Sequence, residues 1–340
     1  MFHNWLDRWD EGRAQRGEEA KKTTDLILDA DRAFPGVGAA ETLEGFCVLA
    51  EKSAVDPGFF EPPDASDRSF ELRDGWLTFP SDVATDVAEN NIVWAKITAS
   101  GKRDRALVIF HHWNATRRNR QIAGFLSSRG ITVIEIAMPY HFERSRPGSL
   151  YADYIISANL GRTVQALRQA VWDGRKLIRW LKCEGYQDVS VFGMSLGSWV
   201  AGLVAAHEPA VARASLFLPA GSLAEMVWTG RATRSIRKSL EPHLTLAQLQ
   251  RAWAPLNLEN HADRLARPDL ELHVILASRD TVVLPDLSER LLQRLESVGV
   301  RLSVLRLNCG HYSLGRPPYI LRAGWSLMRF LLRKREAAQA

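Results

Sequence analysis

The motif Gly-Met-Ser-Leu-Gly at positions 193–197 is the part of the sequence whose residue types and spacing best fit catalytic chemistry. An apolar run, residues 189–192, precedes it, and an apolar segment with helical character follows. A serine between two glycines can occupy a sharp turn from strand to helix, because glycine has no Cβ to collide with the neighbouring backbone. Such a turn would lift the Ser195 hydroxyl above a sheet and aim the first N–H groups of the helix at an oxyanion. We therefore predict that Ser195 is a nucleophile.

A serine hydroxyl is a weak nucleophile and needs a base, with an acid that orients the base. In open α/β sheets the reacting groups lie at the carboxyl ends of strands, so the partners should follow later strands. Asp280 is the first carboxylate after an expected strand over residues 272–277, and His311 follows one over residues 302–307. The order Ser, Asp, His along the chain is the one that this serine turn requires. We predict that Asp280 and His311 complete the site.

Other interpretations of these residues exist. Asp280 could instead cap a helix that begins near Leu284. Asp286 is a rival acid, but it falls inside that expected helix. Cys309 lies two residues before His311 and could suggest a Cys/His pair, yet a nucleophile is already present elsewhere. The positions after strands therefore favour Asp280 and His311 in the catalytic roles.

Three histidines and a glutamate near strand ends make a metal site conceivable; they are His111, His112, His141 and Glu143. No pair among them has chelating or helical spacing, and serine chemistry needs no metal. We expect neither a metal nor another cofactor.

Apolar runs and helical segments alternate from residue 106 onward, which predicts a parallel sheet covered on both faces. Residues 70–79 and 91–99 are expected to be antiparallel strands that lead into it. The predicted fold class is α/β, with a mostly parallel, doubly wound sheet of about eight strands flanked by helices. Expected core strands cover residues 106–110, 131–137, 189–192, 214–218, 272–277 and 302–307, and expected helices cover 118–129, 161–184, 198–207, 284–298 and 320–333.

Two regions interrupt this alternation. Residues 1–69 are expected to form a helical and irregular extension, in which Phe2, Trp5, Leu6 and Trp9 share one helical face. That face could pack on its own domain, touch a membrane or contact a second subunit. Residues 221–268 are longer than a simple crossover requires, so we expect a cap or lid. Residues 70–220 and 269–340 would form the core.

At the serine motif, at residues 278–285 and at Gly310-His311, the chain resembles the α/β-hydrolase superfamily, in its esterase and lipase-like branch. The resemblance runs from about residue 106 to 330. It implies that Ser195 is the nucleophile, that His311 is general base and then acid, and that Asp280 orients the imidazole.

The resemblance also implies an oxyanion donor on the loop after the third core strand. By this alignment the backbone N–H of Trp113 joins that of Leu196. The chain departs from the family by placing His112 where glycine is usual. The residues expected to contact substrate are His112, Tyr140, His141, Met194 and Trp228.

Alternatives for the substrate residues remain open. The segment with Tyr140, His141 and Arg144 could simply fold back on itself. Trp228 and Trp253 could form the small core of the cap instead of a pocket wall.

Composition narrows the function class. The 340 residues carry a net charge of +5, but basic and acidic residues are interleaved, so we expect no nucleic-acid partner. Three cysteines without metal or disulfide spacing are typical of a reducing compartment, and we predict a cytoplasmic protein. The sequence lacks a secretory apolar region and any run near the ~18 apolar residues of a membrane span, so no integral membrane segment is expected.

The predicted activity is hydrolysis of a small-molecule carboxylic ester through an acyl-enzyme. Alternatives on the same triad are a serine peptidase and an acyltransferase, and a third is a catalytically silent binding protein with this fold. A homodimer is possible through the face with Trp5 and Trp9.

Overall fold

The computed structural model describes residues 2–19, 21–36, 42–63 and 70–333, with side chains from residue 5 onward. Its sheet has the strand order β1-β2-β3-β5-β4-β6-β7-β8-β9. Pairing is antiparallel from β1 to β3 and between β3 and β5, and parallel in every other pair. The strands are β1 (Glu71–Arg73), β2 (Trp76–Pro80), β3 (Ile92–Thr98), β4 (Arg105–Phe110), β5 (Ile131–Ile136), β6 (Asp188–Met194), β7 (Val211–Phe217), β8 (Glu271–Ala277) and β9 (Leu302–Leu307).

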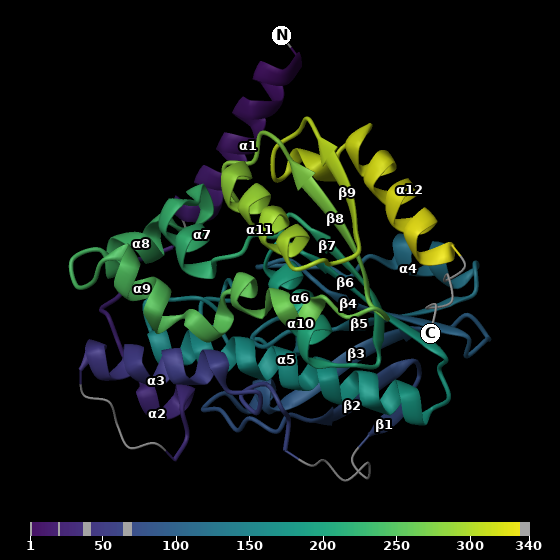
Figure 1. Cartoon of the computed structure of the whole chain (residues 1–340), viewed down its shortest axis with the longest axis horizontal. Helices are drawn as coiled ribbons and strands as arrows, with labels where there is room; N and C mark the ends of the chain where they lie inside the picture. The colour runs from purple at the N-terminus through teal and green to yellow at the C-terminus, as the bar shows by residue number, and fades with distance from the viewer. Residues whose placement is uncertain (1, 20, 37–41, 64–69, 334–340) are drawn as a thin grey trace.

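The helices lie on both faces of this sheet (Figure 1). The expected class, a mostly parallel α/β sheet covered by helices, is confirmed. The α-helices are α1 (Phe2–Glu19), α2 (Ala30–Ala33), α3 (Leu43–Val55), α4 (Arg120–Ser127), α5 (Leu160–Cys183), α6 (Leu196–His207), α7 (Leu223–Thr229), α8 (Arg234–Leu240), α9 (Leu246–Ala252), α10 (Ala262–Leu265), α11 (Pro285–Ser297) and α12 (Tyr319–Leu332).

The expectation of one strand over residues 70–79 is wrong. The segment forms two antiparallel strands, β1 and β2, joined by Asp74 and Gly75. Both turn residues have positive φ, 53° and 74°. An Asp-Gly pair with this backbone matches the right-handed twist of a hairpin, so the chain reverses there. Within the described residues, this hairpin brings the sheet to nine strands instead of about eight.

Each face of the sheet has its own apolar core. One cluster joins the sheet to α4 and α12 and includes Leu126, Phe192 and Phe330. A larger cluster joins it to α5, α6 and α11. Both faces of the central strands are therefore buried, and β7 and β8 have no exposed residue. This explains why these strands lack polar alternation.

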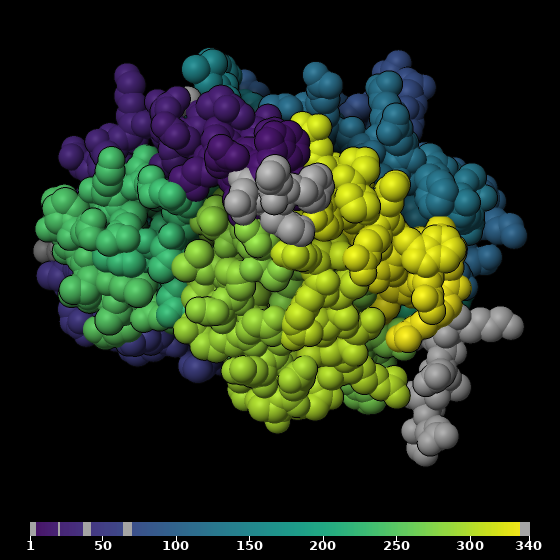
Figure 2. All heavy atoms as spheres, turned by 90° about the horizontal axis from the view of Figure 1, so that it is seen from above, coloured from purple at the N-terminus to yellow at the C-terminus, as the bar shows by residue number. Residues whose placement is uncertain are grey.

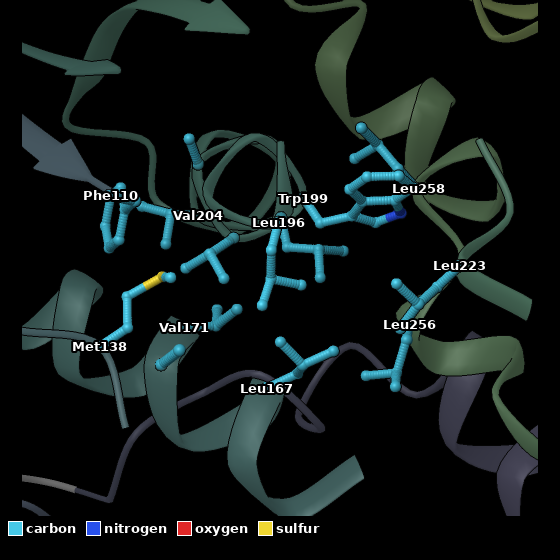
Figure 3. Close-up of a cluster of buried hydrophobic side chains, with 14 of the residues drawn as sticks. Phe110, Met138, Leu167, Val171, Leu196, Trp199, Val204, Leu223, Leu256 and Leu258 are labelled. Atoms are coloured by element: carbon cyan, nitrogen blue, oxygen red, sulfur yellow. The ribbon is translucent and has the colours of Figure 1, made fainter. Parts of the chain in front are cut away.

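Helix α6 lies in the middle of the larger cluster, and all its residues are buried. Figure 3 shows Leu196 and Trp199 of α6 packed between Leu167 of α5 and Leu256 and Leu258 of the 221–268 segment. The helix that follows the serine is thus fixed from several sides. A rigid helix gives Ser195, at its N-terminal end, a fixed position above the sheet.

Residues 221–268 contain α7 to α10 and pack against the N-terminal region. Helix α3 lies beside α9, where Arg251 pairs with Glu44 (2.7 Å) and Glu51 (2.6 Å). Figure 2 shows the purple N-terminal segment lying against both the green 221–268 region and the yellow C-terminal part. The division into extension, core and cap stays a prediction.

Part of the apolar face of the first helix packs against the rest of the chain. Leu6 is buried in the cluster with α12, whereas 53% of Trp5 is exposed. Trp9 is half-buried and lies 4.6 Å from the Arg316 guanidinium. The side chain of Phe2 lies outside the described residues. Contact of this face with a second copy stays a prediction.

None of the helices within the described ranges combines the length and the apolar character that crossing a bilayer requires.

Candidate active site

Ser195 occupies the turn between β6 and α6. Its backbone has φ 52° and ψ −123°, a region that residues with side chains rarely adopt. A Cβ on Gly193 would lie 2.0 Å from the Gly197 carbonyl oxygen, and one on Gly197 would lie 2.2 Å from the Phe110 carbonyl oxygen. Neither glycine can therefore carry a side chain, and the sequence motif at 193–197 is required by the geometry of the turn.

Two hydrogen bonds connect Ser195, His311 and Asp280. His311 Nε2 lies 3.1 Å from Ser195 Oγ, and His311 Nδ1 lies 2.7 Å from Asp280 Oδ2. Because the Asp280 carboxylate accepts a hydrogen bond from His311 Nδ1, the neutral ring carries its proton on Nδ1. Nε2 is then free to accept the hydroxyl proton. The structure thus brings the three sequence-predicted residues together in an order that suits proton transfer.

Asp280 is held by the backbone that follows it. Its Oδ1 accepts hydrogen bonds from the N–H of Val282 (2.7 Å) and Val283 (2.9 Å), and only 3% of the residue is exposed. Helix α11 begins later, at Pro285, and its N-cap residue Leu284 makes no side-chain cap. Asp280 is therefore not the N-cap of that helix, and its two oxygens are divided between the turn and His311.

The alternative acid, Asp286, and the alternative nucleophile, Cys309, lie in environments unlike those of Asp280 and Ser195. Asp286 is exposed in the first turn of α11. Cys309 is buried, and burial together with nearby Asp10 and Asp280 raises the pKa of its thiol to about 12. A thiol with so high a pKa stays protonated near neutral pH and is a poor nucleophile. These placements favour Ser195 over Cys309.

Asp10 of α1 holds the loop that carries His311, a contact that the sequence analysis missed. Asp10 Oδ1 accepts from the N–H of Tyr312 (2.6 Å) and Ser313 (3.0 Å). The fit is close, because a Cβ on Gly310 would lie 2.6 Å from Asp10 Oδ2. On the same helix Asp7 pairs with Arg279, next to Asp280. No local pattern signals a contact across three hundred residues.

Lys21 is a second residue of the N-terminal region beside the site. Its Nζ lies 4.0 Å from the centre of the Trp113 ring and 2.7 Å from Glu18 Oε1. Burial lowers the pKa of Lys21, although Glu18 opposes the shift. The ammonium thus packs on the loop that carries the expected oxyanion donor.

The loop after β4 carries Trp113 and is tied to a second loop. Trp113 Nε1 donates to the Ala152 carbonyl oxygen (2.8 Å), and Asn114 Oδ1 accepts from the Ala152 N–H (2.9 Å). Asn114 has φ 56°, in the left-handed region. The other expected donor, the N–H of Leu196, is the first of α6 and so has no acceptor within its own helix.

The residues expected to contact substrate differ in how far their side chains are exposed. Tyr140 and His141 are buried, and contact of these side chains with substrate stays a prediction. Arg144, considered with them, is fully buried in an ion pair with Asp173 (2.8 Å). These three side chains are thus enclosed by protein, and the choice between a pocket wall and a loop that folds back on itself stays a prediction.

The two tryptophans of the 221–268 segment also differ. Trp253 is fully buried among the apolar residues of the larger cluster. Trp228 is half-buried, with the Arg237 guanidinium 5.4 Å from its ring. Trp253 is therefore part of the core and not of an open pocket wall.

Met194 and His112 line an apolar groove between α4 and α12, about 570 Å³ in volume. His112 is exposed at the surface, yet the surrounding protein and the nearby His311 lower its pKa to about 4. The His112 ring is therefore neutral near pH 7 and does not compete with His311 for the serine proton. Met194 directly precedes Ser195 in the chain, but the residues that line the groove do not include Ser195, Asp280 or His311.

Comparison with known proteins gives a similarity of fold. No protein-family model matches the chain. Two uncharacterised proteins of Mycobacterium tuberculosis, from strains CDC 1551 / Oshkosh and ATCC 25618 / H37Rv, are 26% identical to it over 131 residues, 38% of this chain. The match spans 29% of the length of these curated relatives.

Solved structures of esterases and a peptidase share the architecture. The acetyl xylan esterase from Paenibacillus sp. R4 has a TM-score of 0.60 at 12% identity, covering 91% of this chain and 96% of that chain. Acetyl xylan esterase 1 from Thermoanaerobacterium sp. JW/SL YS485 has a TM-score of 0.59 at 16% identity, covering 94% and 97%. A puromycin-hydrolyzing peptidase of Mycobacterium tuberculosis has a TM-score of 0.56 at 18% identity, covering 71% and 37%.

The sheet order, the turn at Ser195 and this shared architecture agree with one another. The resemblance that the motifs indicated is thereby confirmed at the level of the fold, and the chain has the α/β-hydrolase fold.

Proposed function

We propose that the protein is a serine hydrolase that cleaves small carboxylic esters through an acyl-enzyme on Ser195. The observation that carries the proposal is the pair of hydrogen bonds from Ser195 to His311 and from His311 to Asp280 (3.1 and 2.7 Å). Catalysis needs such a chain because the base must take the hydroxyl proton as the oxygen attacks. No metal or other cofactor enters the proposed reaction.

In this mechanism His311 Nε2 accepts the proton of Ser195 as its oxygen attacks the ester carbonyl carbon. The N–H groups of Trp113 and Leu196 stabilise the oxyanion of the tetrahedral intermediate. His311 then protonates the leaving alcohol, and water, activated by the same imidazole, releases the acid. Asp280 stabilises the imidazolium that forms twice in each cycle.

A peptidase on the same triad is the second candidate. The coverage of the solved structures favours the esterase, since the match spans 96% and 97% of the two acetyl xylan esterases but 37% of the peptidase. An ester also has the better leaving group, so the same triad cleaves it more readily than an amide. We place the protein in the cytoplasm because its cysteine usage fits a reducing compartment.

The experiment compares p-nitrophenyl esters of increasing acyl length with matched p-nitroanilides. We expect Ser195-dependent turnover of short and medium esters, and slower or no turnover of the anilides. Ser195→Ala and His311→Ala should lower kcat by about a thousandfold or more, and Asp280→Asn by as much or somewhat less. Ser297→Ala, at an exposed serine near the end of α11, serves as the control. Wild-type turnover no faster than that of Ser195→Ala would reject the proposal, and faster anilide cleavage would favour the peptidase.

A further inference from the structure

The rings of His111 and His141 contact each other and lie next to the backbone of the loop that carries Trp113. His111 follows β4 and His141 follows β5, and these strands are neighbours in the parallel part of the sheet. Their ring centres are 4.6 Å apart with the planes at 61°. His141 is 2% exposed, so this ring contacts protein on all sides.

The hydrogen-bond partners fix where each ring carries its proton. In His111, Nδ1 lies 2.9 Å from the His112 carbonyl oxygen and Nε2 accepts from the Met138 N–H (3.1 Å). In His141, Nδ1 lies 2.9 Å from the Pro139 carbonyl oxygen and Nε2 accepts from the Asn114 N–H (3.0 Å). A carbonyl requires a donor and an N–H requires an acceptor. Both rings are therefore neutral, with the proton on Nδ1.

These bonds orient the two peptide groups on either side of Trp113. The carbonyl of His112 and the N–H of Trp113 belong to one planar trans peptide and point in opposite directions. The bond from His111 Nδ1 to that carbonyl, together with the bond from the Ala115 N–H to the same oxygen (3.3 Å), therefore sets the direction of the Trp113 N–H. The bond to His141 fixes the next peptide through the N–H of Asn114, whose φ of 56° is disfavoured without such support.

We propose that His111 and His141 are positioning residues that hold the Trp113 N–H in the direction needed to bind the oxyanion. The inference rests on the proposed function and adds a role for two residues that do not touch the reacting atoms. An oxyanion hole works because its donors are aligned before the reaction, so the supports of the loop contribute to kcat.

The pKa values of His111 and His141 agree with neutral rings. Burial lowers the pKa of His141 to about 4; the hydrogen bond to the Pro139 carbonyl opposes the shift, and His112 and Arg144 add to it. Burial also holds the pKa of His111 well below its usual value; His141 and Arg118 lower it further, while the hydrogen bond to the His112 carbonyl opposes the shift. A second proton would place an N–H against the N–H of Met138 or Asn114. These hydrogen bonds occupy all four ring nitrogens. A metal ion could therefore bind a ring nitrogen only if one of the hydrogen bonds were broken.

The test uses isosteric amides in a crossed design. The side-chain amide of asparagine reaches about as far as Nδ1 of histidine, and that of glutamine about as far as Nε2. His111→Asn therefore keeps the donor to the His112 carbonyl, while His111→Gln does not. At the other ring His141→Gln keeps the acceptor for the Asn114 N–H, while His141→Asn does not.

The readout is the ratio of kcat for an oxoester to kcat for its thionoester, both measured on one preparation. Sulfur accepts hydrogen bonds weakly, so the thionoester depends less on the oxyanion hole. Both rates scale with the amount of folded enzyme, and the ratio is therefore independent of how much of a variant folds. KM should change little, because the donor acts mainly in the transition state.

We expect the ratio to fall by about tenfold or more in His111→Gln and His141→Asn. It should stay closer to the wild-type value in His111→Asn and His141→Gln. His273→Gln, at a buried histidine bound to Ser215 (2.8 Å) and Ser326 (2.9 Å) away from the site, should leave the ratio unchanged.

Equal ratios for asparagine and glutamine at a position, or the reverse order, would overturn the role of that histidine. Equal losses on both esters would point to a merely structural role and would overturn it as well. A wild-type enzyme without Ser195-dependent ester turnover would instead overturn the proposed function, and this inference with it.

Discussion

Asp10 in the first helix accepts hydrogen bonds from the backbone N–H groups of Tyr312 and Ser313, directly after His311 (2.6 and 3.0 Å). The N-terminal helix is thus part of the framework that sets the position of the proposed base. A carboxylate that accepts from two backbone amides in a buried site makes strong, charge-assisted bonds. The region that looked like an extension in the sequence therefore bears on the chemistry of the site.

Asp10→Ala should lower kcat by about tenfold or more, because the His311 loop loses the oxygen that accepts both of its hydrogen bonds, and with it about 1–2 kcal/mol of local stability. Asp10→Asn retains an amide oxygen as acceptor and should be affected less. Steady-state kinetics on a p-nitrophenyl ester measures both variants.

Glu11→Gln is the matched control, because Glu11 pairs with Arg231 (2.5 Å) at a more exposed place on the same helix. Exposed ion pairs contribute little, so its kcat should stay within about twofold of wild type. Equal losses in Asp10→Ala and Glu11→Gln would contradict a specific role for Asp10.

Gly197→Ala should prevent the native turn at Ser195. The added Cβ would lie 2.2 Å from the Phe110 carbonyl oxygen, which is backbone in a central strand and has nowhere to move. We expect a loss of stability of several kcal/mol, or failure to fold, from the strain of overpacking. Urea denaturation followed by circular dichroism measures the free energy of unfolding.

Gly124→Ala in α4 provides the comparison. Apart from the neighbouring residues and backbone of its own helix, no atom of the described residues lies within 4 Å of a Cβ at this position, so alanine should be neutral or stabilise the helix by up to about 1 kcal/mol. Similar free energies of unfolding for Gly197→Ala and the wild type would show that the turn can open to admit a side chain.

Buried neutral histidines should make the fold sensitive to mild acid. Burial lowers the pKa of His207 to about 3 and those of His261 and His273 to about 4. The unfolded chain binds protons at these residues near pH 6.5, while the folded chain does not until the pH is much lower. The unfolded state therefore binds more protons between these values, and stability must fall as pH drops from about 6.5 toward 4.

His273→Gln isolates one of these contributions. The wild type loses up to about 1.4 kcal/mol per pH unit at this residue below pH 6.5, whereas the variant loses none there. The difference in free energy of unfolding between the two should shrink as the pH is lowered from 7 to 5. A constant difference over this range, measured by urea denaturation, would contradict a lowered pKa at His273.

The sequence predicted the parts of the fold that depend on local pattern. Continuous apolar runs placed the core strands, since both faces of the sheet are buried, and glycine spacing placed the Ser195 turn. The hairpin at Asp74 and Gly75 was missed although its Asp-Gly signal is local. Ranking that turn signal above the apolar run would have found it.

Contacts between distant segments could not be predicted in this way. The bonds from Asp10 to the His311 loop join the two ends of the chain. The role inferred for His141 depends on the register of two neighbouring strands and on which ring nitrogen faces Asn114. Neither residue type nor spacing contains that information, so both required the three-dimensional structure.

Covalent labelling with a fluorophosphonate, located by mass spectrometry of peptides, tests directly whether Ser195 is an activated nucleophile. We expect one rapid adduct on Ser195, no adduct at that site in Ser195→Ala, and much slower labelling in His311→Ala, because the base activates the hydroxyl. Failure of the wild-type protein to be labelled at Ser195, or labelling at an equal rate without His311, would contradict the role of Ser195 as a nucleophile activated by His311.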